Sequence, residues 1–286
     1  MTLVQALILA LLQGVSELFP VSSLGHTILL PALLHWNNIK RDDPTFLSFV
    51  VVLHLGTAIA LVIFYRRDWY KLIRALVGSI VRGRLSDDRD ERIAWLLVVG
   101  TIPVGLLGIL FQEPVRKLFG TVEPAAVFLV INGFIMFFGE SLRRRQHVTQ
   151  GRAYKRLENL TWAQSIFVGI GQSLALFPGI SRSGASIVAG LLADLDHEDA
   201  AKYSFLLATP VILAASLLKI PDLFGAAAHV TLVEAILGGI LAGIAAYFSV
   251  AFLTRYFQHN DLRPFGWYCI AFGAICFALA RIGVIR

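Results

Sequence analysis

Two short polar strings interrupt an otherwise apolar chain, and their residue types suit the handling of a phosphorylated compound. The first string runs Gln13-Gly-Val-Ser-Glu17-Leu-Phe-Pro-Val-Ser22-Ser23-Leu-Gly25-His26. The second runs Phe177-Pro178-Gly179-Ile-Ser181-Arg182-Ser183-Gly184. Ionisable residues at membrane depth are costly, so their first interpretation is functional. We expect the carboxylate and imidazole of one string and the guanidinium of the other to form two halves of one site.

Hydroxyls beside an imidazole in the first string suggest a nucleophile and its base. Ser22 or Ser23 near His26 fits that pair, with Glu17 orienting or assisting the imidazole. In the alternative, His26 attacks phosphorus itself and a serine only donates a hydrogen bond. Polar residues at a helix break also often do no more than cap the next helix. The spacing alone leaves all three interpretations open.

Gln13 and Glu17 are four residues apart and therefore share one face of a helix. Oxygen ligands on one face can hold a hard cation such as Mg²⁺ or Ca²⁺, with water and phosphate oxygens completing its shell. Only one of the two side chains is anionic. We therefore expect a cation here to be held jointly with the substrate.

Arg182 in the second string needs an anion, and its planar fork of donors suits phosphate oxygens. The turn Ser181-Arg182-Ser183-Gly184 opens a helix, so backbone N–H groups and the helix dipole also favour an anion there. In the alternative, Arg182 pairs with a buried glutamate and holds the two strings together. The two roles are compatible.

Three other features rank lower. His54 lies within an apolar run, where lining a cavity and making a packing hydrogen bond explain it equally well. Gln172 lies one and a half turns before Pro178 and is expected to face the site. The two cysteines, Cys269 and Cys276, are expected to behave as small hydrophobic residues rather than as a disulfide or metal pair.

The composition predicts an all-α polytopic membrane protein. The chain is 57% hydrophobic and 15% charged, whereas soluble domains carry about 25% charged residues. A spanning helix needs roughly 17–25 mostly apolar residues. Six runs approach that length: Phe46–Tyr65, Ile93–Phe111, Val122–Gly139, Tyr203–Leu218, Leu232–Leu253 and Phe265–Ile285. Segment 66–84 mixes aromatic and basic residues and suits an amphipathic helix at the membrane interface.

Each polar string is predicted to be the tip of a re-entrant helix–loop–helix hairpin, over 3–36 and 161–194. Proline ends the preceding helix, and irregular backbone at membrane depth must be buried or line a cavity. The alternative is that 3–18 spans the membrane and the first string is a surface loop. Three spans follow each hairpin, so the second repeat, 161–286, should be inverted relative to the first, 1–140. A basic linker, 141–160, joins them in one membrane domain, 1–286.

The basic residues predict the orientation. The predicted loops on the side of the membrane opposite the N-terminus hold 17 of the 25 Lys and Arg residues, and the loops and ends on the N-terminal side hold seven. Basic residues accumulate in cytoplasmic loops. We therefore expect a multi-pass protein of the bacterial inner membrane, with both termini and the mouth of the first hairpin in the periplasm. Basic loops that set the membrane orientation explain the net charge of +6 better than nucleic-acid binding does. No nucleic-acid partner is expected.

Over essentially its whole length the chain resembles the bacterial undecaprenyl-diphosphate phosphatases of the bacitracin-resistance type. The resemblance rests on both strings, on Gln172 and on His54-Leu-Gly-Thr57. It implies hydrolysis of the terminal phosphate of undecaprenyl diphosphate to give the monophosphate carrier for peptidoglycan synthesis. It also implies a divalent-cation requirement, an outward-facing site and reduced bacitracin sensitivity. The expected partners are the polyprenyl diphosphate and membrane lipids, and a homodimer is left open.

The resemblance also assigns roles by position. Four residues correspond to the catalytic residues of that family: Glu17, Ser23, His26 and Arg182. The expected substrate-binding residues are Gln13, Ser22, Gly25, Gln172, Gly179, Ser181, Ser183 and Gly184. Gln13 falls where the family accepts Glu or Gln, and Leu24 replaces a common Thr. The alternative function is a polyprenyl-phosphate transporter or flippase, since inverted repeats with broken helices are typical of transporters; Ser23 and His26 favour an enzyme.

Overall fold

The computed structural model describes residues 1–39, 44–111, 120–149, 151, 153–219 and 232–285, and their regular structure is helical. Six of these helices are long and apolar enough to cross a membrane. They are α3 (Pro44–Phe64), α5 (Arg89–Leu110), α7 (Val122–Arg144), α10 (His197–Lys219), α11 (Leu232–Tyr256) and α12 (Arg263–Arg281). These helices match the six predicted runs, so the prediction of an all-helical, multi-pass membrane protein is confirmed.

Each polar string lies between two shorter helices. The first string joins α1 (Leu3–Ser16) to α2 (Ser23–Leu33), and the second joins α8 (Trp162–Ser173) to α9 (Arg182–Leu192). Each break contains a proline, which lacks the backbone N–H that a continuing helix would need. Both helix pairs lie within the predicted hairpin ranges, 3–36 and 161–194.

The two short helix pairs begin with the same local signals. Thr2 caps α1 in a capping box with Gln5, and Thr161 caps α8 in a capping box with Gln164. Each box satisfies two backbone donors at a helix start. At the second helix of each pair, the hydroxyl of Ser22 or Ser181 accepts a hydrogen bond from the glycine N–H three residues later.

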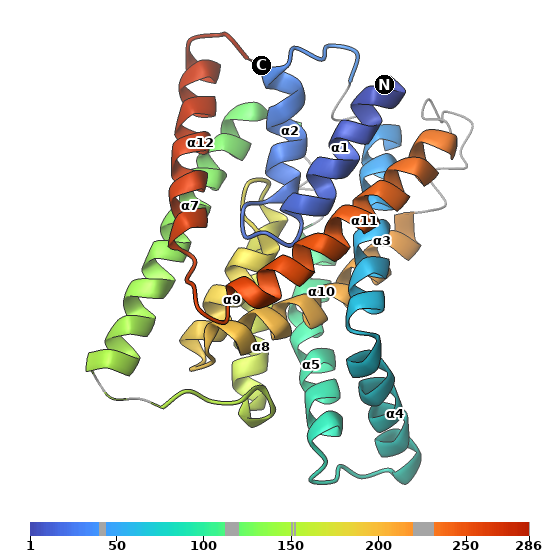
Figure 1. Ribbon diagram of the computed structural model, residues 1–286, viewed down its shortest axis with the longest axis vertical. Coiled ribbons are helices and arrows are strands. Elements are labelled where there is room, and N and C mark those ends of the chain that lie inside the picture. Colours follow the sequence, from blue (N-terminus) through green and yellow to red (C-terminus); the bar gives the residue numbers. More distant parts are fainter. Residues whose placement is uncertain (40–43, 112–119, 150, 152, 220–231, 286) are drawn as a thin grey trace.

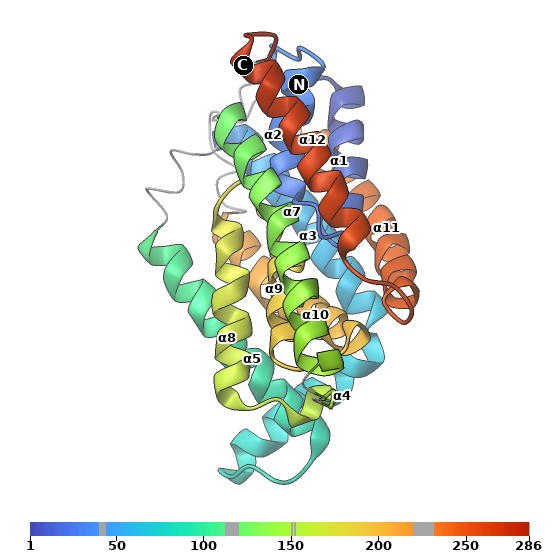
Figure 2. The same ribbon diagram turned by 90° about the vertical axis from the view of Figure 1, so that its left-hand side faces the viewer.

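The two short helix pairs enter the molecule from opposite ends of its long axis (Figure 1). Figure 2, turned by 90°, shows the same arrangement, with α1 and α2 towards one end and α8 and α9 towards the other. The breaks meet in between: a Cβ placed on Gly25 would lie 3.1 Å from the Cα of Gly179. The two polar strings, distant in sequence, are therefore in contact.

Close helix crossings hold the bundle around these breaks. A Cβ on Gly56 of α3 would lie only 2.0 Å from the carbonyl oxygen of Gly239 of α11, so no larger residue fits at this crossing. Small residues at such contacts are typical of helix packing in membranes. Large apolar side chains face outward instead, with Ile109 73% and Phe248 68% exposed, as expected of a surface in contact with lipid.

The predicted amphipathic segment is helix α4 (Arg66–Arg82), which follows α3 at the end of the molecule away from the chain's start (Figure 1). Leu72 is buried, whereas Tyr70 and Val81 are exposed. The helix is therefore confirmed, and its placement at a membrane interface stays a prediction.

Candidate functional site

Glu17, one residue beyond the end of α1, is the centre of a buried polar cluster. Its carboxylate is 6% exposed. Arg182 reaches Oε1 with Nε at 3.3 Å and Nη2 at 3.2 Å. Oε2 accepts hydrogen bonds from Ser23 Oγ at 2.5 Å and Gln13 Nε2 at 3.1 Å, and it lies 3.2 Å from His54 Nε2. Four side chains from four different helices thus converge on one carboxylate.

Ser23 is the first residue of α2, and its hydroxyl points across the helix break toward Glu17. The residue before it, Ser22, has a φ of +70° and caps the helix by accepting a 3.2 Å hydrogen bond from the N–H of Gly25. A non-glycine residue at positive φ is strained, and such strain clusters at functional sites. The local backbone therefore orients Ser23 rather than leaving it on a mobile loop.

His26 does not pair with either serine hydroxyl. Its Nδ1 lies 2.7 Å from the Ser22 carbonyl oxygen, and its Nε2 lies 2.7 Å from the Tyr268 hydroxyl. The ring stacks on Tyr268 and Phe272 of α12, with centroids 5.6 and 5.1 Å away. Glu17, rather than His26, is hydrogen-bonded to Ser23. The catalytic role expected for His26 stays a prediction.

Arg182 opens α9 and brings the second string to the first. Besides its ion pair with Glu17, Nη1 lies 3.4 Å from the Ser204 carbonyl oxygen on α10. The alternative in which Arg182 pairs with a buried glutamate is therefore what the structure shows. The role in phosphate binding stays a prediction, and the two roles share the same donors.

The rest of the second string packs directly on the first. Ser183 Oγ donates to the Phe19 carbonyl oxygen at 3.1 Å and lies 3.0 Å from Ser181 Oγ. Ser181 Oγ also accepts from the N–H of Gly184 at 3.1 Å. Gly179 has a φ of +110°, and a Cβ there would lie 2.3 Å from the Ala125 carbonyl oxygen. Only glycine fits this turn against α7.

Two residues at or beside the cluster are hard to assign from the sequence. His54 makes the packing hydrogen bond expected of it, since Nδ1 lies 2.8 Å from the Val50 carbonyl oxygen, and its Nε2 faces Glu17; its expected place in the lining of a cavity stays a prediction. Asn132 of α7 was not singled out at all, yet it is fully buried between the two strings. The signal that could have found it is a carboxamide in the middle of an apolar run.

Gln172 is buried on α8, and neither atom of its amide has a hydrogen-bond partner among the described residues. No described hydrogen bond connects it to Glu17 or Arg182. The structure therefore does not bring it into the polar cluster through a direct contact, and its expected role in substrate binding stays a prediction.

Protein donors surround the carboxylate of Glu17 in this arrangement, and the cation expected beside Gln13 and Glu17 stays a prediction. Donors from Arg182, Ser23, His54 and Gln13 itself already surround both carboxylate oxygens. Gln13 Oε1 is the one buried ligand oxygen here without a described partner. Hard cations take six or more oxygen ligands, and the described residues contain no cluster of three or more metal-binding side chains. These two residues alone do not fit a bound Mg²⁺ or Ca²⁺.

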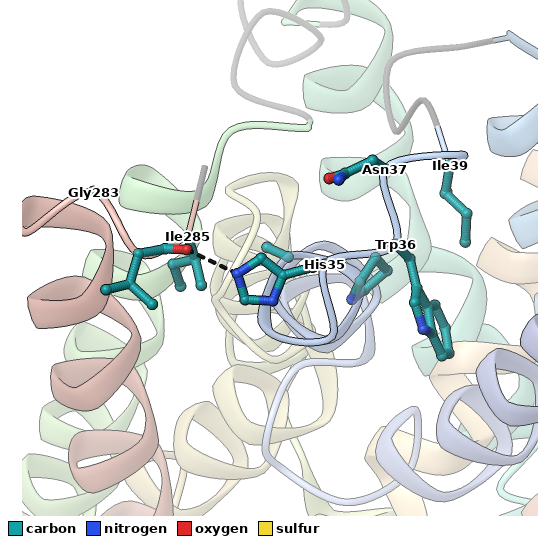
Figure 3. A pocket seen from close by; sticks show the side chains of 9 residues that line it. His35, Trp36, Asn37, Ile39, Gly283 and Ile285 are labelled. Carbon is teal, nitrogen blue, oxygen red and sulfur yellow. Dashed lines mark hydrogen bonds between the residues drawn. The ribbon is translucent and has the colours of Figure 1, made fainter.

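A pocket of about 360 Å³ lies elsewhere, between the end of α2 and the turn after α12 (Figure 3). In the lining of this pocket, His35 Nε2 lies within hydrogen-bonding distance, 3.1 Å, of the Val284 carbonyl oxygen. Its lining contains no carboxylate and no hydroxyl side chain. The pocket therefore lacks the groups that the polar cluster has, and we place the candidate active site at Glu17.

Comparisons with known proteins show the family of this chain. The family model described as bacitracin resistance protein BacA matches residues 6–275. Undecaprenyl-diphosphatase 2 of Chromobacterium violaceum is 46% identical, over 96% of this chain and 98% of its own length. Undecaprenyl-diphosphatase of Acidiphilium cryptum is 44% identical over 99% of this chain and 100% of its own length. Undecaprenyl-diphosphatase 2 of Frankia alni is 41% identical over 98% of this chain and 99% of its own length. The chain belongs to the bacitracin resistance protein BacA family.

Proposed function

We propose that this protein is a membrane phosphatase that hydrolyses undecaprenyl diphosphate to undecaprenyl phosphate and inorganic phosphate. The observation that carries the proposal is the Ser23 hydroxyl bonded to Glu17, with Arg182 on the same carboxylate. Those groups supply a nucleophile, a proton acceptor and an anion-binding fork within one buried cluster. The names of the relatives support the choice of substrate. Recycling of the lipid carrier and bacitracin resistance follow from that activity.

Substrate binding begins at Arg182. The guanidinium nitrogens that now pair with Glu17 Oε1 are suited to two oxygens of the terminal phosphate. The N–H groups of Arg182 and Ser183 precede the first hydrogen bond of α9 and favour the same anion, whereas that of Gly184 is bonded to Ser181 Oγ. When Arg182 turns to phosphate, Oε1 of Glu17 loses two donors. The carboxylate then has room to accept a proton.

Phosphoryl transfer then follows from the position of Ser23. Its Oγ bonds to the terminal phosphorus, the bond from that phosphorus to the bridging oxygen breaks, and the Ser23 proton passes to Glu17. Undecaprenyl phosphate leaves with the bridging oxygen. Water next cleaves the phosphoserine, which releases inorganic phosphate and restores the Ser23 hydroxyl. Such reactions depend chiefly on positioning and charge stabilisation, which the cluster of donors provides.

We further infer that the two hairpins are inverted structural repeats. Their helix-start residues share one offset of 159 positions (2 and 161, 5 and 164, 22 and 181, 25 and 184). The bounds of α2 and α9, 23–33 and 182–192, differ by the same 159. Entry from opposite ends of the molecule supports the inversion (Figure 1). The repeat boundaries 1–140 and 161–286 and the linker 141–160 belong to this proposal.

The orientation, the oligomeric state and the cation complete the proposal. We place both termini and the mouth of the first hairpin in the periplasm, on the distribution of Lys and Arg. A cation would have to arrive with the diphosphate, whose oxygens would supply most of its shell. The oligomeric state is left open, with a homodimer as one candidate assembly.

Phosphate release from undecaprenyl diphosphate by detergent-purified protein tests the proposal. We expect release by the wild type, its loss in Arg182→Ala, and wild-type rates in Thr101→Val, which removes a hydroxyl bonded within α5 away from the cluster. Parallel assays with EDTA test the cation requirement. Folded wild-type protein that binds the lipid but releases no phosphate would contradict the enzyme and favour a transporter.

A further inference from the structure

Asn132 lies in the middle of α7, the spanning helix against which both breaks pack. Its side chain has no exposed surface. α7 contacts the second string at Gly179, where its backbone leaves no space for a side chain. The residue is thus the polar group that this helix presents to both polar strings at once.

Both ends of the Asn132 carboxamide are bonded, each to a different string. Oδ1 accepts a 3.0 Å hydrogen bond from the backbone N–H of Ser181. Nδ2 donates to the Pro20 carbonyl oxygen at 3.0 Å, with Cys269 Sγ a weaker neighbour at 3.4 Å. The helix breaks leave backbone groups without helical partners, and buried groups of this kind must be satisfied. A carboxamide carries a donor group and an acceptor group in one plane, which matches one free carbonyl oxygen and one free N–H.

The bonded backbone groups lie next to the reactive side chains. Ser181 directly precedes Arg182, and Pro20 lies three residues from both Glu17 and Ser23. A shift of either string relative to α7 would therefore change the separation between Arg182 and Ser23. The Ser183 hydroxyl joins the two strings directly, through the Phe19 carbonyl oxygen. Other helices hold one string at a time, as His54 of α3 does at Glu17 and Ser204 of α10 does at Arg182. Asn132 additionally fixes both strings to a spanning helix.

We propose that Asn132 is a positioning residue that sets the distance between the nucleophile-bearing string and the phosphate-binding string. The inference rests on the proposed phosphatase function. Asn132 acts through Arg182 and Ser23 and touches neither the substrate nor the reacting atoms. Because a misplacement of about 1 Å can cost roughly 100-fold in rate, removing these two bonds acts mainly on turnover.

Asn132→Leu, which keeps the approximate size and removes both bonds, tests the proposal. We expect kcat to fall by about 100-fold, while the purified variant remains folded in detergent. Thr101→Val is the matched control, since it also removes a hydrogen-bonding group from a long apolar helix, one whose described bond goes to Leu97 of the same helix. Wild-type kcat in folded Asn132→Leu would overturn the proposal.

A double-mutant cycle with Arg182→Lys, a variant expected to keep a lowered but measurable kcat, separates positioning from a general structural effect. If Asn132 acts by placing Arg182, the Leu substitution lowers kcat far less in the Arg182→Lys background than in the wild type, because contacting residues are not additive. Equal fold-losses of kcat in both backgrounds would contradict the proposal that Asn132 acts through Arg182.

Hydrogen exchange of segment 177–184 gives a readout that does not depend on activity. Loss of the Asn132 acceptor frees the Ser181 N–H, so exchange in this segment should speed up in Asn132→Leu and stay unchanged in Thr101→Val. Unchanged exchange would show that Asn132 does not hold the string. If wild-type protein released no phosphate, the proposed function would fail, while this comparison would still decide whether Asn132 ties the strings together.

Discussion

The Ser23 hydroxyl donates a 2.5 Å hydrogen bond to Glu17 across the break between α1 and α2. That contact pairs the proposed nucleophile with a carboxylate, although an imidazole stands only three residues away on the same helix. His26 instead binds the Ser22 carbonyl oxygen and the Tyr268 hydroxyl. The proposed mechanism therefore gives the first proton transfer to Glu17.

Ser23→Ala should reduce phosphate release by at least about 100-fold, since it removes the attacking oxygen while leaving the Arg182–Glu17 pair in place. The measurement is kcat with undecaprenyl diphosphate, and Thr101→Val serves as the control. A phosphoserine trapped in the wild type by rapid acid quenching, and absent from the alanine variant, would identify the intermediate. Full activity of Ser23→Ala would instead favour attack by His26 or water.

Glu17→Gln should lower kcat by about 100- to 10,000-fold, the usual range for loss of a general base. The substitution is nearly isosteric, so a normal elution profile in detergent should accompany the loss. It also leaves Arg182 without its buried anion, which predicts a lower unfolding temperature. The double variant Glu17→Gln/Arg182→Gln should recover part of that stability without recovering turnover. Retention of wild-type kcat by Glu17→Gln would remove the carboxylate from the mechanism.

Arg182→Lys should not substitute for arginine, because lysine offers a point charge in place of a planar fork. We expect a raised KM and a lowered kcat, because one ammonium group cannot reproduce the two-nitrogen contact with Glu17 Oε1 or with the phosphate. Measuring both constants against Lys202→Arg, a charge-conserving change at a residue paired with Asp68, controls for the exchange of basic residues. Wild-type constants in Arg182→Lys would show that a single positive charge is sufficient.

His54 should matter through the position of the Glu17 carboxylate. His54→Phe removes the nitrogen that lies 3.2 Å from Oε2, and we expect kcat to fall by about 10-fold. His54→Gln retains a nitrogen donor and should keep more activity than the phenylalanine variant. Identical losses in both variants would mean that the ring contributes packing rather than a hydrogen bond to Glu17.

Much of the fold could be predicted from the sequence because its signals are local. Spanning length and hydropathy predicted the six long helices, and proline next to capping serines predicted the breaks near Pro20 and Pro178. The candidate site was also recognisable, because Glu17 and Arg182 are ionisable residues in apolar surroundings. These features depend on residue type and on neighbours within a turn or two.

The partners of those residues were decided by tertiary structure. Ser23 and His26 share a helix, but stacking on Tyr268 and Phe272 of α12 turns the imidazole away, and Tyr268 is 242 positions distant. His54 and Asn132 join the site only because α3 and α7 pack against the breaks. The sequence by itself determined which groups were present and where helices ended, since both follow from local chemistry. Only the packing of distant helices decided which donor faces which acceptor, because a hydrogen bond requires contact within about 3 Å.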